Sequence, residues 1–499
     1  MDTVLAIDAG TTGVRAMLVD PTKRVLSRGY REFPQSFPQP GWIEHDPDDW
    51  WNALLAATDE ALASAGLTAM DLAAIGITNQ RETTVLWDRD TLKAVHPAIV
   101  WQDRRTAPLC RTLVDEGWEP RIRERTGLVV DPYFSVTKLA WLLEHVEGAR
   151  DRAAAGTLAF GTVDSYLLAR LTGGAVHATD DTNASRTMLF DIHRRAWDDE
   201  LCEGLGVPTS LLPEVRPSCG RFGVTDPDVF LGARIPISGI AGDQQASLFG
   251  HGCTRPGQTK NTYGTGSFLL MHTGDTAVPS PGGLLTTMAA STDERPAYAL
   301  EGAIFVSGAA IQWLRDGLGI IADAAEVGPL AASVPDAGGV VFVPALTGLG
   351  APWWDPDARG TIVGITRGTT KAHLARATVE ALAYQTRDVV DLMRRDSGLD
   401  LPELRVDGGA SAMDLLLQLQ ADVLDAPVVR PAVLETTAMG AALLAARGEG
   451  IWPEAAFADA AVDGRATFTP RDPSATEAGY RRWRRAVERS LHWEGADGG

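Results

Sequence analysis

Cysteine is scarce in this chain, and its few copies are scattered. No two of the 4 cysteines have the CxxC spacing of a zinc or redox site. They stand at Cys110, Cys202, Cys219 and Cys253. The sequence therefore predicts neither a zinc site nor a disulfide framework, and we expect a protein of the reducing cytoplasm.

Long apolar runs and an excess of basic residues are also missing. No stretch approaches the roughly 18 apolar residues of a membrane-spanning helix, and the N-terminal MDTVLAIDAG lacks the basic start of a signal peptide. The formal net charge is -20, from 65 acidic and 45 basic side chains. This balance argues against a general binder of nucleic acid, and the missing apolar run argues against an integral membrane segment.

Two Thr/Gly-rich hairpins indicate how the 499 residues are divided, since so long a chain exceeds one hydrophobic core. The segments 3–8 and 14–20 are predicted strands around the tip AGTTG, and 260–271 repeats this arrangement. Helical and strand patterns alternate between the hairpins, which is typical of α/β domains. We therefore predict two α/β domains of like construction, 1–251 and 252–499.

Several segments have the apolar spacing of helices that cover such sheets. In HDPDDWWNALLAATDEAL, Asp46 is the predicted N-cap and Pro47 the first helical residue. The segments 137–146, 370–395 and 436–447 continue the pattern. The sequence thus predicts helices packed on sheets in both halves.

The tips of both hairpins have residues that suit phosphate. Glycines let the backbone come close to a ligand, and hydroxyls and amide N–H groups hold phosphate oxygens. In the first tip, Asp8 precedes Gly10-Thr11-Thr12-Gly13, and its carboxylate is a candidate ligand for the Mg²⁺ of a nucleotide. The second tip is Tyr263-Gly264-Thr265-Gly266-Ser267. Ordinary hairpin turns have the same residues, and neither tip matches the P-loop pattern GxxxxGK[ST].

A third glycine-rich turn follows the predicted strand 404–406. There Asp407-Gly408-Gly409 leads into an apolar helix. A glycine pair at a helix N-terminus admits a flat or charged ligand, but a tight strand-to-helix connection uses the same residues. Both interpretations stay open at this point.

A polar cluster follows the apolar run 73–77, where a strand is predicted to end. Its members are Asn79, Gln80, Arg81 and Glu82. Ligands bind at this end of the strands in open α/β sheets. An adjacent Arg and Glu can hold neighbouring hydroxyls, one donating and the other accepting. A solvated surface turn is the alternative.

For three more residues, the local sequence does not distinguish a ligand-binding role from a structural one. Trp101 in VWQDRR and Tyr133 in DPYFS are candidate walls of a ligand site, or else core residues. Asp243 in GIAGDQQASLFG lies among small and apolar residues, where an unpaired carboxylate is costly. Taken locally, Asp243 is a predicted helix N-cap.

Several long segments resemble the glycerol kinases of the FGGY carbohydrate kinase family. They include TNQRETT, ISGIAGDQQASLFG, KNTYGTGSFLLM and two family signatures, which appear at 133–145 and 360–380. The similarity runs in the same order from residue 3 to about residue 493. It implies two actin-like (ribonuclease H-like) α/β domains with the active site in the cleft between them. The polyol site and the first phosphate hairpin would lie in the N-terminal domain, and the nucleotide site in the C-terminal domain.

The resemblance also implies an activity and its residues. The implied activity is Mg²⁺-dependent transfer of the γ-phosphoryl group of ATP to a terminal hydroxyl of glycerol. The product is sn-glycerol 3-phosphate, and the reaction belongs to glycerol catabolism. The resemblance also implies a homodimer or homotetramer. Asp243 would accept the proton of the attacking hydroxyl, and Asp8 would hold Mg²⁺. The implied polyol contacts are Arg81, Glu82, Trp101, Tyr133, Asp243 and Gln244. The implied nucleotide contacts are Thr11, Thr12, Arg15, Thr265, Gly308, Gln312, Gly409 and Met413.

The chain departs from the usual glycerol kinase pattern in three places. Ala9 stands where Gln is common, and Gly13-Val14 replace a Ser-Ser pair, so backbone N–H groups must do more of the binding at the first tip. Met413 stands where an Asn near the adenosine is common. A thioether cannot replace the donor and acceptor of an amide. We therefore expect weak recognition of adenine or ribose there, but intact phosphoryl transfer.

Two other functions stay open. FGGY relatives share the ATP machinery and differ in the substrate pocket, so another polyol or ketose, such as erythritol or xylulose, is the first alternative. An actin- or Hsp70-like ATPase is the second and more remote one. Such a protein would need the phosphate tips but neither the polyol residues nor Asp243.

Overall fold

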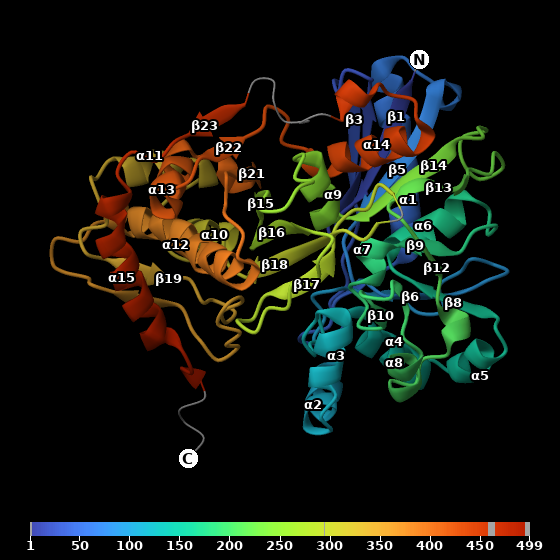
Figure 1. Cartoon of the computed structure of the whole chain (residues 1–499), viewed down its shortest axis with the longest axis horizontal. Helices are drawn as coiled ribbons and strands as arrows, with labels where there is room; N and C mark the ends of the chain where they lie inside the picture. Colours follow the sequence, from blue (N-terminus) through green and yellow to red (C-terminus); the bar gives the residue numbers. More distant parts are fainter. Residues whose placement is uncertain (1, 294, 458–464, 495–499) are drawn as a thin grey trace.

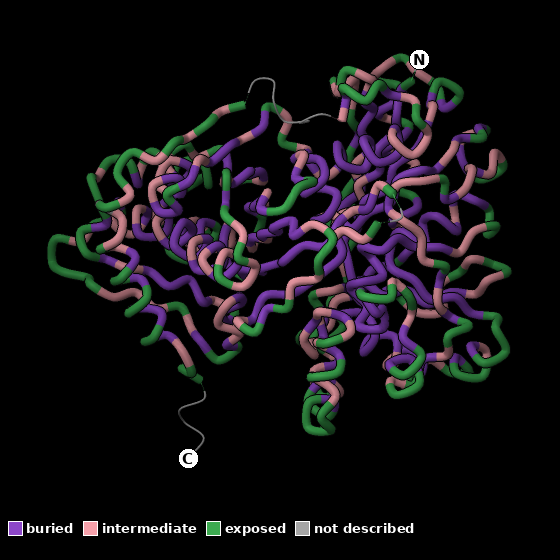
Figure 2. Tube along the Cα trace, in the orientation of Figure 1, coloured by how far each residue is buried: buried purple, intermediate pink, exposed green. Residues whose placement is uncertain are grey.

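The computed structural model describes residues 2–293, 295–457 and 465–494. Two lobes lie side by side, each built around one large β-sheet (Figure 1). Buried backbone runs through the centre of both lobes and their junction, whereas exposed segments lie at the periphery (Figure 2). The predicted α/β architecture of two sheet-centred units is confirmed.

The N-terminal lobe contains a six-stranded sheet in the order β13-β14-β5-β1-β2-β3. β1 and β2 pair antiparallel, as predicted for the first hairpin, while β1, β5 and β14 run parallel. The strands are β1 (Thr3–Ala9), β2 (Gly13–Val19), β3 (Val25–Glu32), β5 (Leu72–Asn79), β13 (Cys219–Val224) and β14 (Pro236–Gly242).

Alternate side chains of β1 face different helices. Ile7 packs into the core beneath α1 (Pro47–Ala65), and Ala6 packs into the core beneath α14 (Thr436–Glu449). The strand is apolar at both kinds of position because both faces of the sheet are covered. Asp46 is the N-cap of α1, as predicted, and its carboxylate accepts a hydrogen bond from a first-turn backbone N–H.

The C-terminal lobe contains a seven-stranded sheet in the order β17-β18-β16-β15-β21-β22-β23. β15 and β16 form the predicted second hairpin, and β15 runs parallel to β21. The strands are β15 (Thr259–Tyr263), β16 (Ser267–Gly274), β17 (Leu285–Met288), β18 (Tyr298–Ile304), β21 (Leu404–Gly408), β22 (Val428–Arg430) and β23 (Ala466–Phe468).

α14 belongs to the C-terminal half of the sequence but packs on the N-terminal sheet and on α9 (Asp243–Gly250) (Figure 1). The two helices approach closely because Gly440 has no side chain: a Cβ there would overlap the Ala246 carbonyl. α14 thereby supports the helix that begins at Asp243. The sequence pattern predicts α14 as a helix but does not predict that it packs on the N-terminal sheet.

Smaller elements complete the lobes. Between β3 and β14 the chain forms α1, the short strands β4 (Glu44–His45), β6 (Val85–Asp88), β7 (Ala98–Ile99), β8 (Leu158–Gly161), β9 (Ala178–Asp180), β10 (Phe190–Asp191), β11 (Ala196–Trp197) and β12 (Glu214–Arg216), and the helices α2 (Ala107–Asp115), α3 (Glu119–Thr126), α4 (Ser135–His145), α5 (Ala149–Ala154), α6 (Val163–Leu171), α7 (Asp181–Ala184) and α8 (Asp199–Gly204). The C-terminal lobe adds α10 (Gly308–Asp316), α11 (Val327–Ala332), β19 (Val341–Val343), β20 (Thr361–Val363), α12 (Lys371–Ser397), α13 (Asp414–Leu424) and α15 (Pro473–Ser490). Within the described residues, no helix is long and apolar enough to cross a membrane.

Candidate active site

The predicted polyol residues gather at one end of the N-terminal sheet. β5 and β14 are parallel neighbours, and Asn79 pairs with Gly242 where both strands end. Arg81 follows the first strand and Asp243 follows the second, so both side chains lie just beyond the strand ends. This is the ligand-binding edge of open α/β sheets.

Arg81 is the centre of this group. Its Nε lies 3.3 Å from Asp243 Oδ1, and its Nη2 donates to Tyr133 Oη at 3.4 Å. The Phe268 ring lies nearby, with its centroid 6.0 Å from the guanidinium carbon of Arg81. The Arg81 side chain is only 2% exposed, so this cation depends on carboxylate neighbours for its stability.

The best-bonded partner of Arg81 comes from the C-terminal lobe. Glu301, on β18, accepts hydrogen bonds from Arg81 Nη1 at 2.6 Å and from Nη2 at 3.0 Å, which is a bidentate pair. Arg186 donates to Glu301 at 3.0 Å and to Glu82 at 2.6 Å. The side chains of Arg186 and Glu301 are 0% exposed. Two arginines and two glutamates thus form a buried network that joins the lobes.

This network determines the charge states of its members. Burial by itself raises the pKa of Glu301, but Arg186 and Arg81 lower it to about 2, so the carboxylate is ionised. Burial by itself lowers the pKa of Arg81, and Glu301 more than any other neighbour raises it well above its ordinary value. Each of these buried charges therefore has a counter-charge from another side chain of the network.

Glu82 has an unfavourable backbone conformation. Its φ is 61°, in the left-handed region that costs a non-glycine residue on the order of 1 kcal/mol or more. The Glu82 carbonyl accepts hydrogen bonds from Ser135 Oγ and Thr84 Oγ1, both at 3.1 Å. Residues 79–82 are all buried, so the surface-turn alternative is wrong. Backbone strain of this kind is concentrated at ligand sites.

Trp101 and Tyr133 form an aromatic corner beside Arg81. Their rings meet edge to face, with centroids 5.5 Å apart and planes at 72°. Both residues are half-buried, so neither is fully enclosed in a core. Trp101 Nε1 also donates to Thr11 Oγ1 at 3.0 Å. This bond ties the aromatic corner to the first phosphate tip.

Asp243 is the first residue of α9, and Gly242 occupies the cap position. The prediction of Asp243 as the N-cap is therefore wrong by one residue, although its carboxylate accepts a hydrogen bond from the Gln244 backbone N–H at 2.7 Å. Its side chain is 31% exposed, unlike the closed network beside it. Burial raises the pKa of Asp243, while Arg81 and Lys260 lower it. Asp243 therefore combines the basicity and the access that a proton acceptor needs.

Sequence reasoning missed several residues that contact this group, among them Arg186, Gln245, Glu301, Lys260 and Phe268. Lys260 is buried, and its Nζ donates to Gln244 Oε1 and to Thr262 Oγ1, the latter at 2.9 Å. A signal for Glu301 was present, because YALEGAIF places a carboxylate inside an apolar run, where an unpaired charge is costly. The sequence names no partner for that charge. Lys260 and Phe268 lie on the strands of the predicted second hairpin, outside the tip whose residues indicate phosphate binding.

The predicted nucleotide residues of the C-terminal lobe line one cavity of about 740 Å³. They are Thr265, Gly308, Gln312, Gly409 and Met413. Much of the remaining wall is small or apolar, including Ile311, Pro329, Ala332 and Leu415. Met413 packs against Gly328, where a Cβ would come 3.1 Å from Met413 Cγ. Such a wall offers a flat base dispersion contacts and few hydrogen bonds.

The second phosphate tip is fixed to the start of α10. Gly308 N donates to Gly264 O at 3.0 Å, and Ala309 N donates to Thr265 O at 3.0 Å. A Cβ on Gly308 would lie 2.6 Å from Gly264 O, so this close approach requires glycine. The tip and the helix therefore form one rigid edge of the cavity.

The third glycine-rich turn does not lead straight into a helix. β21 ends at Gly408, a 3₁₀ turn covers Gly409–Ala412, and α13 begins at Asp414. Gly408 has a φ of 84°, and a Cβ there would overlap the Tyr263 backbone. Gly408 thus makes the tight connection, and Gly409 lines the cavity.

The first phosphate tip lies outside the lining of this cavity. Arg15 Nη1 lies 3.9 Å from Asp8 Oδ2 across the β1–β2 pair. Burial raises the pKa of Asp8 to about 6; Arg15 lowers it and Asp243 raises it. Thr12 is exposed and Thr11 is half-buried. The structure therefore brings the predicted nucleotide residues together in two groups, one on each lobe.

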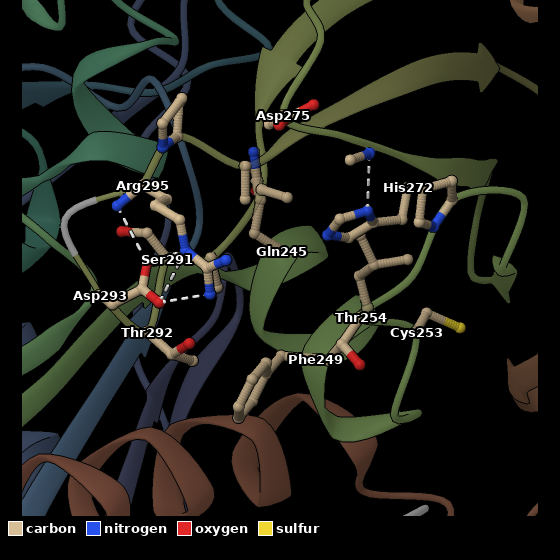
Figure 3. A pocket seen from close by; sticks show the side chains of 17 residues that line it. Gln245, Phe249, Cys253, Thr254, His272, Asp275, Ser291, Thr292, Asp293 and Arg295 are labelled. Atoms are coloured by element: carbon tan, nitrogen blue, oxygen red, sulfur yellow. Dashed lines mark hydrogen bonds and ion pairs between the residues drawn. The ribbon is translucent and has the colours of Figure 1, made fainter.

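A second cavity, of about 370 Å³, lies beside α9 (Figure 3). Its lining, within the part of the chain that the structure describes, contains none of the predicted site residues. Gln245 forms part of the wall: its side-chain amide donates to Met288 O at 3.2 Å, and its side-chain oxygen accepts from Arg81 at 3.3 Å. Gln245 thus separates this cavity from the polyol residues.

Known proteins match the chain over most of its length. Residues 3–250 match the N-terminal domain of the FGGY family of carbohydrate kinases, and residues 259–449 match its C-terminal domain. A glycerol kinase of Halorhodospira halophila is 56% identical over 497 residues, covering 99% of this chain and 98% of that protein. One of Symbiobacterium thermophilum is 56% identical over 492 residues, covering 98% of each. The crystal structure of Plasmodium falciparum glycerol kinase with ADP matches with a TM-score of 0.92 at 34% identity, covering 98% of each chain.

Proposed function

The chain belongs to the FGGY family of carbohydrate kinases, and on this premise we propose that it phosphorylates glycerol with ATP. The γ-phosphoryl group passes to a terminal hydroxyl of glycerol, and sn-glycerol 3-phosphate is released. Identity of 56% to two glycerol kinases over nearly the full chain supports this substrate. The observation that carries the proposal is the convergence of fixed donors, acceptors and an aromatic corner on the accessible carboxylate of Asp243.

The residues around Asp243 suit a small polyol. Arg81 donates to one hydroxyl and Glu82 accepts from its neighbour, a combination that matches vicinal hydroxyls. Trp101 and Phe268 offer apolar surface to the carbon chain. The buried network holds Arg81 and Glu82 in defined orientations. Their side chains are at most 2% exposed, so a polyol contacts them only after a local rearrangement.

Proton transfer is the task of Asp243. A primary alcohol is a poor nucleophile near neutral pH, and phosphoryl transfer depends mainly on alignment and charge. The Asp243 carboxylate accepts the hydroxyl proton as the new O–P bond forms, and the bond from the γ-phosphorus to the departing ADP oxygen breaks on the opposite side. Arg81, 3.3 Å from Asp243, keeps the carboxylate oriented.

The first tip fits a Mg²⁺–ATP complex. Burial and the nearby charge of Asp243 disfavour the ionised form of Asp8, and a divalent cation would relieve that cost. Mg²⁺ is usually held by one or two carboxylates and the substrate phosphates. We assign Asp8 to the cation, which when bound neutralises phosphate charge, and Thr11, Thr12, Arg15 and Thr265 to the phosphates.

ADP release with glycerol, erythritol, xylulose and gluconate tests the proposal. Glycerol should give a kcat/KM at least about tenfold above each of the others. A preference for another compound would assign the chain to a different FGGY substrate. ATP turnover that is indifferent to every alcohol would favour an actin- or Hsp70-like ATPase.

Static light scattering on the same sample should show a homodimer or homotetramer.

A further inference from the structure

Three polar side chains form a row across the first three strands of the N-terminal lobe. The register pairs Asp8 with Arg15, and Arg15 with Tyr30 on β3. Directly opposed residues on neighbouring strands point to the same face of a sheet, so all three side chains share one face. The Arg15 guanidinium lies 3.9 Å from Asp8 and 5.6 Å from the centroid of the Tyr30 ring. Asp8 and Arg15 have assigned roles toward the nucleotide, whereas Tyr30 has none.

The Tyr30 hydroxyl reaches the phosphate tip itself. Its Oη lies 3.4 Å from Thr12 Oγ1. A Cβ built on Gly13 would lie 2.7 Å from Tyr30 Oη and 2.6 Å from Arg31 O, so the space in front of Gly13 is filled. Here the hydroxyl beside the tip comes from the neighbouring strand.

We propose that the Tyr30 hydroxyl donates a hydrogen bond to a phosphate oxygen of the nucleotide at the first tip. The proposal rests on the proposed kinase function and adds a phosphate-binding residue from outside the hairpin. A phenol O–H is a single donor, and its bond to a charged phosphate oxygen is stronger than one between neutral groups. Arg15, lying near the ring, helps to keep Tyr30 in position.

A structural role for Tyr30 makes a different prediction. If Tyr30 only packed against Arg15 and Thr12, its ring would matter and its hydroxyl would not. The substitution Tyr30→Phe removes the hydroxyl and keeps the ring. It therefore isolates the proposed hydrogen bond from the packing.

Calorimetric titration of the full chain with ATP, ADP and adenosine, in Mg²⁺ and without any polyol, tests the proposal. Tyr30→Phe should weaken ATP and ADP binding by about tenfold, as expected for a lost bond to a charged group. Adenosine, which has no phosphate, should bind as before. Tyr384→Phe, which removes a hydroxyl from α12 in the other lobe, is the matched control and should leave all three affinities unchanged.

Unchanged ATP and ADP affinities in Tyr30→Phe would overturn the proposal. An equal loss for all three ligands would also overturn it, because it would indicate a disturbed fold and not a lost phosphate contact. This test involves no alcohol, so its outcome is separate from that of the substrate panel. A chain that phosphorylates another polyol would still lose affinity in Tyr30→Phe, whereas a chain that binds no ATP would overturn both proposals.

Discussion

The residues proposed to bind the polyol (the polyol half of the site) and those proposed to bind the nucleotide (the nucleotide half) are held in place by different means. In the polyol half, charged side chains bind one another: Arg81 is bidentate to Glu301, and Arg186 bonds to both glutamates. These side chains are at most 2% exposed. In the nucleotide half, Thr265 and Gln312 are exposed, and much of the cavity wall is glycine or apolar.

We attribute the difference to the two proposed ligands. A polyol is small and neutral, so it is recognised by donors and acceptors that are already fixed around its hydroxyls. A nucleotide is large and brings its own charge, so backbone N–H groups and open space at two tips are enough to receive its phosphates. The polyol half is therefore ordered by the protein's own charges. The nucleotide half leaves more of its interactions to be made by the ligand.

The largest effect is expected from Asp243→Asn, which keeps the shape of the side chain and removes the proton acceptor. The kcat should fall by about 10²- to 10⁴-fold, measured by coupled ADP release. ATP affinity, measured by calorimetry, should stay nearly the same because the cavity wall is untouched. Turnover near that of the unaltered chain would reject Asp243 as the base.

The next largest effect is expected from Arg81→Ala, which removes a hydroxyl donor and one partner of Glu301. The KM for glycerol should rise by about 10- to 100-fold, the range for lost bonds to a charged group, while the KM for ATP changes little. The free energy of unfolding should fall by about 3–5 kcal/mol, because Glu301 loses a buried counter-charge. Steady-state kinetics and denaturant titration measure the two effects.

The control for Arg81→Ala is Arg125→Ala. Arg125 lies on α3 and pairs with Asp198 at 2.8 Å. It is none of the predicted site residues, so its loss should change neither KM. If Arg81→Ala left the KM for glycerol unchanged, Arg81 would have no place in the polyol site, whatever its effect on stability.

The pH dependence of kcat/KM tests whether Lys260, which comes from the C-terminal lobe, lowers the pKa of the proposed proton acceptor Asp243. Asp243 must be ionised to accept a proton, so activity is lost as pH falls through its pKa, which burial raises above the ordinary 3.8. Lys260 lowers that pKa, and its own pKa of about 8 keeps it protonated in the acid range. Lys260→Met should therefore move the acid limb of kcat/KM to higher pH. Lys260→Arg keeps the charge and should leave the limb in place; a stationary limb in Lys260→Met would contradict the interpretation.

The smallest effect is expected in the nucleotide half. Met413→Asn adds an amide to an apolar wall, and one new hydrogen bond of about 0.5–1.5 kcal/mol should lower the KM for ATP by about 2- to 10-fold. The KM for glycerol should not change. Met413→Leu, which stays apolar, is the control. No gain in Met413→Asn would mean that the adenosine does not contact this wall.

Local patterns were sufficient to predict the elements that carry the site. Apolar strand patterns beside Thr/Gly-rich tips indicate β1–β2 and β15–β16, and Asp46-Pro47 indicates the start of α1, because each depends on neighbours a few residues away. The structure confirms all three. The same patterns predict α14 as a helix, but not its packing on the N-terminal sheet, which lies far from it in sequence.

Residue type and spacing thus account for two hairpins with phosphate-suited tips, and for an acidic residue that opens the helix after β14. The pairing of the buried charges came from the fold. Arg81 and Glu301 are 220 positions apart, and Lys260 meets Gln244 across the two lobes. Coulomb energy depends on distance in space and on how much water is excluded. Neither quantity can be read from the order of residues, so the partners of these charges are known only once the two sheets are side by side.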